Sequence, residues 1–262
     1  MLKDVLKHLE ELGIYKNPET AVITDIDGTI SEIVPRPDEA EVDQEMRLVL
    51  VEIQKRYKLL AFITGRPVES ARKMVDIEDA LYIGNHGMEY LQGNQIILDP
   101  EAANYQSQIR NIEEILKNKL DMDGIILENK KTSLAIHYRL IKNQQKAKTT
   151  ILKIIKTLNL SPDLAVFTGR KIIEIKPKTV NNKGTIIKEI VKKYDIKQLI
   201  YAGDDTTDQD AFKIISKLNK NSFTGISIVV LSDETPQKVA EDADYIVENI
   251  KELEEFFYWL LV

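Results

Sequence analysis

The chain has 262 residues, 43% of them apolar and 30% charged, which is enough apolar material for one large α/β domain or two smaller ones. Lysine and arginine number 36 against 42 aspartates and glutamates, and the resulting net charge of −6 argues against a nucleic-acid partner, which would need a basic face. The absence of cysteine excludes disulfides, thiolate zinc sites and cysteine nucleophiles, and with three histidines any metal should be a hard cation bound by oxygen.

The first and last residues of the chain contain apolar side chains, but neither pattern predicts a membrane segment. Charged residues alternate with leucine at helical spacing in residues 1–12, unlike the continuous apolar stretch of a signal peptide. The apolar run at 256–262 is too short to cross a bilayer. We therefore expect a soluble protein that has no membrane partner. We further expect a cytoplasmic location and a monomer.

Short apolar runs alternate with helical patterns in the two outer parts of the chain, which is typical of βαβ units and a mostly parallel sheet. The predicted strands lie at 21–24, 58–64, 81–84, 198–203, 227–231 and 244–248. The predicted helices among them lie at 42–57 and 186–191. This alternation predicts an α/β fold built on a wound sheet.

The middle of the chain has a different pattern, helix–strand–strand–helix–strand–strand, which is typical of a small open-faced α+β sandwich. The predicted segments lie at 105–120, 124–128, 133–139, 151–158 and, as a hairpin, 164–175. We expect this block to be a domain inserted into the larger sheet. The expected domains are a core of residues 1–103 and 178–262 and an inserted cap of residues 104–177.

Two aspartates, Asp25 and Asp27, follow the strand predicted at 21–24. Since alternate residues of a strand point to the same side, both carboxylates are expected on one side at the carboxyl end of a buried strand. Open α/β sheets bind their ligands at that edge. The alternative is a solvated turn, because Asp-Gly commonly ends a strand.

The triplet Thr64-Gly65-Arg66 ends the strand predicted at 58–64. A hydroxyl and a glycine amide at that position can donate hydrogen bonds to an anion. Alone this is weak evidence, since the same triplet recurs at 168–170. There the predicted hairpin needs only a turn with the glycine at positive φ, so we assign the second copy to structure.

Three more aspartates, Asp204, Asp205 and Asp208, follow the strand predicted at 198–203. Three carboxylates within five residues repel one another unless a cation lies between them, so a hard-cation site explains them better than a surface loop does. Lys183 opens the preceding helix. It is either an ordinary surface lysine or a fixed positive charge facing the same crevice.

Taken together, these residues resemble the four motifs of the haloacid dehalogenase superfamily of phosphohydrolases. The resemblance implies a Rossmann-like parallel sheet core with an inserted α+β cap. It implies that Asp25 is the nucleophile, forming an aspartyl-phosphate, and that Asp27 protonates the leaving oxygen and then activates water. It also implies that Thr64 and Lys183 hold the phosphoryl oxygens.

The same resemblance implies Mg²⁺ as cofactor. Its ligands would be the Asp25 carboxylate, the Asp27 backbone carbonyl, Asp204 and waters, with Asp205 and Asp208 holding those waters in place. The charges favour a cation too, because five carboxylates facing a phosphate dianion would otherwise exclude the substrate.

Further strings resemble the trehalose-6-phosphate phosphatase family in particular. They lie at 25–35, 84–89, 128–130, 137–139, 174–177 and 203–212. The resemblance implies trehalose 6-phosphate as the small-molecule partner, bound by Gly65, Arg66, His86, Glu128, Lys130 and Glu174. For the pair Glu128 and Lys130 the alternative is an exposed ion pair of little energetic value.

Two residues depart from that family's pattern. Gln209 stands where glutamate is usual, and Lys176 stands where arginine is common, although lysine cannot reproduce a bidentate arginine contact. The sugar is therefore open, and phosphatases of sucrose phosphate, mannosylglycerate phosphate or glucosylglycerol phosphate are alternatives. Others are a phosphohexomutase and a non-enzymatic sugar-phosphate sensor, which the Asp25/Asp27 pair disfavours because binding alone needs no nucleophile.

Overall fold

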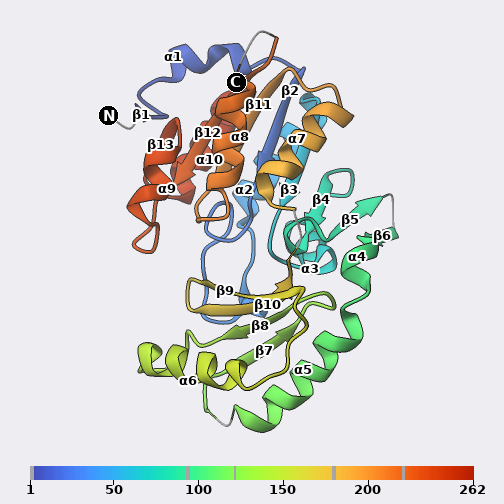
Figure 1. The fold of residues 1–262 in the computed structure, drawn as a ribbon. Helices are drawn as coiled ribbons and strands as arrows, with labels where there is room; N and C mark the ends of the chain where they lie inside the picture. Colours follow the sequence, from blue (N-terminus) through green and yellow to red (C-terminus); the bar gives the residue numbers. More distant parts are fainter. Residues whose placement is uncertain (1–2, 93–94, 121, 179–180, 220–221) are drawn as a thin grey trace. The chain divides into compact units, whose positions relative to one another are not determined.

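The structure, a computed structural model, describes residues 3–92, 95–120, 122–178, 181–219 and 222–262 (Figure 1). Contacts divide the chain into two compact units, one made of Met1–Ile97 with Asn181–Val262 and the other of Leu98–Val180. The cap predicted at 104–177 lies within the second unit, and its boundaries as a domain stay a prediction. Among the helices of the described ranges, none has the length and apolar character needed to span a membrane.

The first unit is built on a sheet in the order β1-β13-β12-β11-β2-β3-β4-β5-β6. Its strands are β1 (Lys3–Asp4), β2 (Thr20–Thr24), β3 (Leu59–Ile63), β4 (Leu81–Gly84), β5 (Glu89–Gln92), β6 (Gln95–Leu98), β11 (Gln198–Gly203), β12 (Thr224–Val230) and β13 (Tyr245–Val247). Neighbours from β1 to β4 pair in parallel, and β5 runs antiparallel to β4. The predicted α/β fold with a mostly parallel sheet is confirmed.

Helices cover both faces of this sheet, as its short apolar strands require. One face packs on α2 (Gln44–Arg56), α3 (Val68–Val75) and α10 (Ile250–Leu261). The other face packs on α7 (Lys183–Lys193), α8 (Gln209–Leu218) and α9 (Gln237–Asp242), and α7 and α8 lie side by side (Figure 1). The fully buried strand β2 shows the alternation, since Val22 points to the first layer and Ile23 to the second. Short helices lie at α1 (Leu9–Leu12), Gly13–Tyr15, Pro37–Glu39 and Asn85–Gly87.

The helical spacing of residues 1–12 produces a helix only at α1. Lys3 and Asp4 instead form β1, which pairs in parallel with β13. The backbone N–H of the fully buried Val5 donates to the carbonyl of Ile246 at 3.0 Å. Pairing with the sheet edge and burial of Val5 outweigh the local helical pattern, because short helices are marginal by themselves.

The second unit has a four-stranded antiparallel sheet in the order β7-β8-β10-β9. Its strands are β7 (Ile126–Asn129), β8 (Leu134–His137), β9 (Leu164–Gly169) and β10 (Ile172–Pro177), and its helices are α4 (Pro100–Ala103), α5 (Gln106–Lys119) and α6 (Gln144–Lys156). The apolar stripes of α5 and α6 pack on one face of the sheet, through residues such as Ile109 and Ile151. The opposite face carries polar side chains such as Glu128, His137 and Glu174, so the predicted open-faced α+β sandwich is confirmed.

The hairpin between β9 and β10 corrects one expectation about the second Thr-Gly-Arg triplet. The residue with positive φ is Lys171, at 60°, whereas Gly169 is in the strand and pairs with Ile172. A Cβ at Gly169 would lie 2.9 Å from the Ile172 side chain. The glycine is therefore needed for space beside its strand partner, and the prediction of a glycine at positive φ was wrong.

Candidate active site

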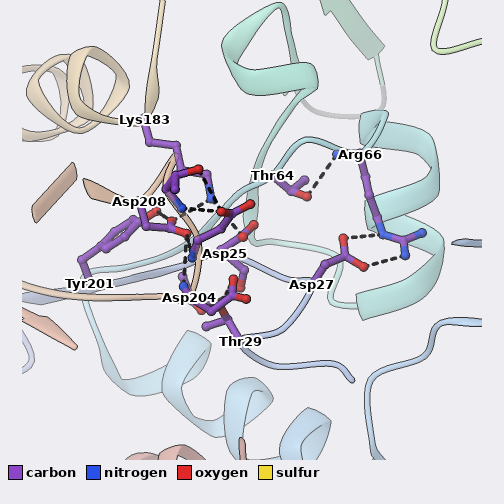
Figure 2. Close-up of polar contacts among 12 residues, drawn as sticks. Asp25, Asp27, Thr29, Thr64, Arg66, Lys183, Tyr201, Asp204 and Asp208 are labelled. Atoms are coloured by element: carbon purple, nitrogen blue, oxygen red, sulfur yellow. Dashed lines mark hydrogen bonds and ion pairs between the residues drawn. The ribbon is translucent and has the colours of Figure 1, made fainter. Parts of the chain in front are cut away.

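The predicted polar residues of the core lie where the strand order reverses. Strand β2 has β3 on one side and β11 on the other, so the chain leaves β2 in one direction and returns on the other side. Asp25, Thr64 and Asp204 directly follow the carboxyl ends of these three strands. Ligands of open α/β sheets bind at such a switch point. Figure 2 shows these side chains gathered beyond the strand ends.

Asp25 is buried, with 6% of its surface exposed, and its Oδ2 lies 2.9 Å from the Nζ of Lys183. Burial raises the pKa of Asp25 to about 7, since desolvation and repulsion from Asp208 and Asp27 outweigh the attraction of Lys183. The site is thus short of positive charge. A bound cation would favour the ionised carboxylate.

Lys183 is held at the start of α7, where the side chain of Asn182 and that of Thr185 form a reciprocal capping box. Only 2% of Lys183 is exposed, and its Nζ lies 2.7 Å from Oδ1 of Asp208. Burial lowers the pKa of Lys183, but the adjacent Asp208 and Asp25 carboxylates more than compensate and raise it. The lysine is therefore a fixed positive charge rather than an ordinary surface residue.

Asp208 is completely buried and accepts four hydrogen bonds. Its Oδ1 accepts from Lys183 and, at 2.5 Å, from the hydroxyl of Tyr201, while its Oδ2 accepts from the backbone N–H groups of Asp204 and Asp205 at 3.1 and 3.0 Å. A Cβ on Gly203 would lie 2.3 Å from the Asp208 carboxyl carbon, so only glycine fits there. Asp208 thus binds the loop after β11 to both Lys183 and the strand.

Tyr201 is a site residue that the sequence analysis missed. It lies on β11 with no exposed surface, and burial together with the Asp208 charge raises the pKa of its hydroxyl well above the ordinary value. The hydroxyl therefore donates to Asp208. The sequence contained one indication of this role. Tyr201 lies two residues before Gly203 on a predicted buried strand, so both residues face the same side of the sheet, and a buried tyrosine hydroxyl needs a hydrogen-bond partner there.

Asp204 contacts the loop that follows β2. Its Oδ1 accepts a hydrogen bond from the Thr29 hydroxyl at 3.3 Å, and only 1% of the residue is exposed. Gly28 has a φ of 83°, and a Cβ there would lie 2.1 Å from Oδ2 of Asp204. Gly28 and Thr29, in the loop after β2, thus leave room for the Asp204 carboxylate, which belongs to the loop after β11.

The carboxylates fit a divalent cation. Oxygen atoms of Asp25, Asp204 and Asp208 lie within 4.8 Å of one another, and hard oxygen donors are the ligands that Mg²⁺ takes. Since four donors already occupy the oxygens of Asp208, the direct ligands would come from Asp25 and Asp204. A second acidic group among the described residues consists of Asp43, Glu45 and Glu254. Its charge is already compensated by a lysine, because Lys251 forms ion pairs with Glu45 and Glu254.

Asp27 does not share the surroundings of Asp25. Both of its carboxylate oxygens accept hydrogen bonds from the guanidinium of Arg66, at 2.6 and 2.7 Å, and Figure 2 shows this side chain turned away from Lys183. Strand β2 ends at Thr24, so the strand alternation does not extend to Asp27. The expectation that both carboxylates lie on one side therefore cannot rest on strand alternation at Asp27, and the contact with Arg66 is one that the sequence did not reveal.

The loop after β3 packs against the turn after β4. The Thr64 hydroxyl is buried and accepts from the Arg66 backbone N–H at 3.1 Å, while the Thr64 carbonyl accepts from the N–H of His86. His86 has a φ of 56°, and its ring atoms lie 2.8 Å from the position that a Cβ on Gly65 would take. Thr64, Gly65, Arg66 and His86 are therefore neighbours.

The predicted residues of the second unit lie on the polar face of its sheet. Glu128 and Glu174 both pair with Ala135, so they flank that residue from the two sides of β8 on the face opposite α5 and α6. Glu174 accepts from Ser133 at 3.0 Å and forms ion pairs with Lys130 at 3.4 Å and Lys176 at 3.2 Å.

Glu128 lies 2.9 Å from Nε2 of His137. Lys130 is 6% exposed and is bound to Glu174. The alternative of an exposed Glu128–Lys130 pair was therefore wrong for the lysine.

Comparison with known proteins gives the family. The trehalose-phosphatase family model matches residues 23–250. The probable trehalose-phosphate phosphatase 3 of Oryza sativa subsp. japonica is 31% identical over 265 residues, covering 92% of this chain and 69% of the relative. Trehalose-phosphate phosphatase B of Arabidopsis thaliana is 29% identical, covering 94% and 67%.

Two solved structures have the same fold. The C-terminal domain of trehalose-6-phosphate phosphatase from C. albicans has a TM-score of 0.80 at 20% identity and covers 100% of this chain and 98% of its own. A trehalose-6-phosphate phosphatase related protein has a TM-score of 0.74 at 22% identity and covers 92% and 96%. By the extent of the family match and the identity to the rice relative, the chain belongs to the trehalose-phosphatase family.

Proposed function

We propose that this protein is a Mg²⁺-dependent phosphatase that hydrolyses trehalose 6-phosphate to trehalose and phosphate. The observation that carries the proposal is the buried Asp25 carboxylate, 2.9 Å from the charged Lys183 at the switch point of the sheet. A carboxylate that burial makes costly to ionise, beside a fixed positive charge, is suited to attack an electrophile rather than to stabilise the fold. Membership of the trehalose-phosphatase family supplies the substrate.

In this proposal Asp25 attacks phosphorus while the bond from phosphorus to the sugar oxygen breaks, and Asp27 gives its proton to that oxygen. Water then attacks the aspartyl-phosphate, Asp27 takes the proton back, and phosphate leaves. Thr64 and Lys183 hold the phosphoryl oxygens. Because both oxygens of Asp27 accept hydrogen bonds from Arg66, Asp27 has to turn from Arg66 toward the reacting oxygen during the cycle.

The cation would be held by Asp25, Asp204 and the backbone carbonyl of Asp27, and it would supply the positive charge that lets a phosphate dianion approach these carboxylates. Asp205 and Asp208 would hold its water ligands. The experiment that tests the function is a phosphate-release screen across sugar phosphates with and without Mg²⁺. Release from trehalose 6-phosphate is expected. Transfer to a sugar without release would indicate a mutase, and binding without turnover would indicate a sensor.

Removal of divalent cations is expected to lower phosphate release by about 10³-fold, because a metal contributes several kcal/mol to stabilising such a charged transition state. The measurement is release from p-nitrophenyl phosphate after treatment with a chelator and desalting, followed by addition of Mg²⁺. Added Mg²⁺ should restore the rate. Full activity in the chelated protein would show that the acidic cluster works without a cation.

We also propose that Glu128, Lys130 and Glu174 bind the sugar, while Gly65, Arg66 and His86 contact the substrate from the core. A sugar hydroxyl needs acceptors and donors, and Glu174 with its two lysine partners offers both. The monomeric state and the cytoplasmic location stay predictions.

Replacement of Glu174 by alanine is expected to lower kcat/KM for trehalose 6-phosphate by about 10- to 100-fold, the effect of losing a charged hydrogen bond. The rate with p-nitrophenyl phosphate should change less than about twofold, since that substrate has no sugar. Glu113→Ala is the matched control, because Glu113 is also ion-paired in the second unit, with Lys117 at 2.6 Å. Equal losses on both substrates would contradict a role of Glu174 in sugar recognition.

A further inference from the structure

Tyr201 is the only member of the Asp208 network in the described residues that belongs to neither a loop nor a helix. It comes from β11 in the middle of the sheet and has no exposed surface. Its ring packs edge-on against Phe212 of α8, with centroids 5.9 Å apart. Strand and helix thus fix the ring, and the ring fixes the position of its hydroxyl.

Asp208 is oriented by three donors that cannot move far. They are the Tyr201 hydroxyl on Oδ1 and the backbone N–H groups of Asp204 and Asp205 on Oδ2. The fourth donor, Lys183, is a compact charge on a flexible stem, so its position depends on what it contacts. Without the hydroxyl, Oδ1 would keep only the lysine as its donor among these four, while the two backbone N–H groups would still hold Oδ2. Oδ1 and Lys183 could then shift together, because no rigid donor would fix this oxygen.

We propose that Tyr201 is a positioning residue for phosphoryl transfer: through Asp208 its hydroxyl sets where Lys183 stands beside Asp25, and it touches no substrate. This inference rests on the proposed phosphatase function of the site. Through Asp208 and Lys183 the residue affects phosphoryl transfer and not sugar binding. Its loss should therefore affect every phosphate monoester alike.

The test is Tyr201→Phe, which removes the hydroxyl and keeps the ring. With Mg²⁺ present, kcat is expected to fall about 10- to 100-fold with both trehalose 6-phosphate and p-nitrophenyl phosphate, as for other residues that orient a site from behind it. Inorganic phosphate should also inhibit less strongly. The matched control is Tyr82→Phe, because Tyr82 is equally buried in the same unit and its hydroxyl donates to the Ile77 carbonyl at 2.9 Å, away from the site. Its kcat should equal that of the wild type.

Two further variants separate positioning from packing. Phe212→Leu disturbs the ring contact but keeps the hydroxyl, and it should lose much less activity than Tyr201→Phe. In an Asp208→Asn background, Tyr201→Phe should add less than about twofold to the loss, because residues that act through one another are not additive. Additive losses, an equal loss in Phe212→Leu, or a Tyr201→Phe protein that is active like Tyr82→Phe would each overturn the proposal.

Unfolding in urea completes the test, since Tyr201→Phe should stay as cooperatively folded as Tyr82→Phe. If Tyr201→Phe alone fails to fold, its role is structural and the proposal is wrong. A wild-type protein that releases no phosphate from any monoester would contradict the proposed function instead. Binding of inorganic phosphate by the wild type and by Tyr201→Phe would still decide whether the hydroxyl positions Lys183, because a loss of affinity supports it and equal affinities overturn it.

Discussion

Replacement of Asp25 by asparagine is expected to abolish phosphate release, with kcat lower by about 10⁴- to 10⁶-fold, as when the nucleophile of another hydrolase is removed. An amide has no oxygen able to form the acyl-phosphate bond. The fold should persist, because the amide oxygen can still accept from Lys183, which lies 2.9 Å from the carboxylate. The measurement is phosphate release from trehalose 6-phosphate and from p-nitrophenyl phosphate.

The matched control for this variant is Asp244→Asn. The Asp244 carboxylate also accepts hydrogen bonds within the first unit, from the backbone and hydroxyl of Ser227 at 2.9 and 2.7 Å, but it lies outside the acidic cluster. Its turnover should match the wild type. If Asp25→Asn kept turnover within about tenfold of the wild type, Asp25 would not be the nucleophile.

Replacement of Lys183 by methionine is expected to lower the free energy of unfolding by about 3–5 kcal/mol, because it leaves the buried Asp25 and Asp208 without their shared cation. Phosphate release should be lost as well. The loss of stability is measured by urea unfolding without Mg²⁺. The control is Lys197→Met, whose lysine pairs with Asp195 in an exposed position and should change stability by less than about 1 kcal/mol.

The pH dependence of this destabilisation follows from Asp25, whose pKa burial already raises from 3.8 to about 7 in the wild type. The folded state therefore holds a proton that the unfolded state releases above pH 3.8, so this group stabilises at low pH and its contribution is lost as pH rises through 7. Without Lys183 the carboxylate should hold its proton to still higher pH. The variant should thus be closer to wild-type stability at pH 5 than at pH 8. A Lys183→Met protein as stable as Lys197→Met at pH 8 would contradict the role of Lys183 as a buried counter-charge.

The parallel sheet could be predicted from the sequence because its strands are short apolar runs, and a strand buried on both faces leaves that pattern at every position. The strand Thr20–Thr24 is buried throughout, and it begins one residue before the predicted strand at 21–24. Asp25 and Asp204 could be predicted as site residues for a related reason. Each directly follows a short apolar run, and a carboxylate at the end of a buried strand has few structural explanations.

What the sequence could not give depends on contacts between distant residues. Asp27 and Arg66 are 39 residues apart, and their bidentate pair depends on how two loops meet. In the sequence Tyr201 fits the apolar pattern of its strand. Its contact with Asp208, seven residues later, depends on the loop that brings Asp208 back to the strand. Val5 joins the sheet through Ile246, at the other end of the chain. Local patterns carry none of this information.

The place of β2 between β3 and β11 also governs how the enzyme can be made. During synthesis β3 emerges soon after β2, whereas β11, which leads to Asp204 and Asp208, emerges only after the whole second unit has been translated. Until then one edge of β2 is unpaired, and such an edge is open to association with other chains. Asp25, the proposed nucleophile, and Lys183 therefore belong to segments that the ribosome releases far apart in time, and no nascent chain that ends before β11 can contain the complete acidic cluster.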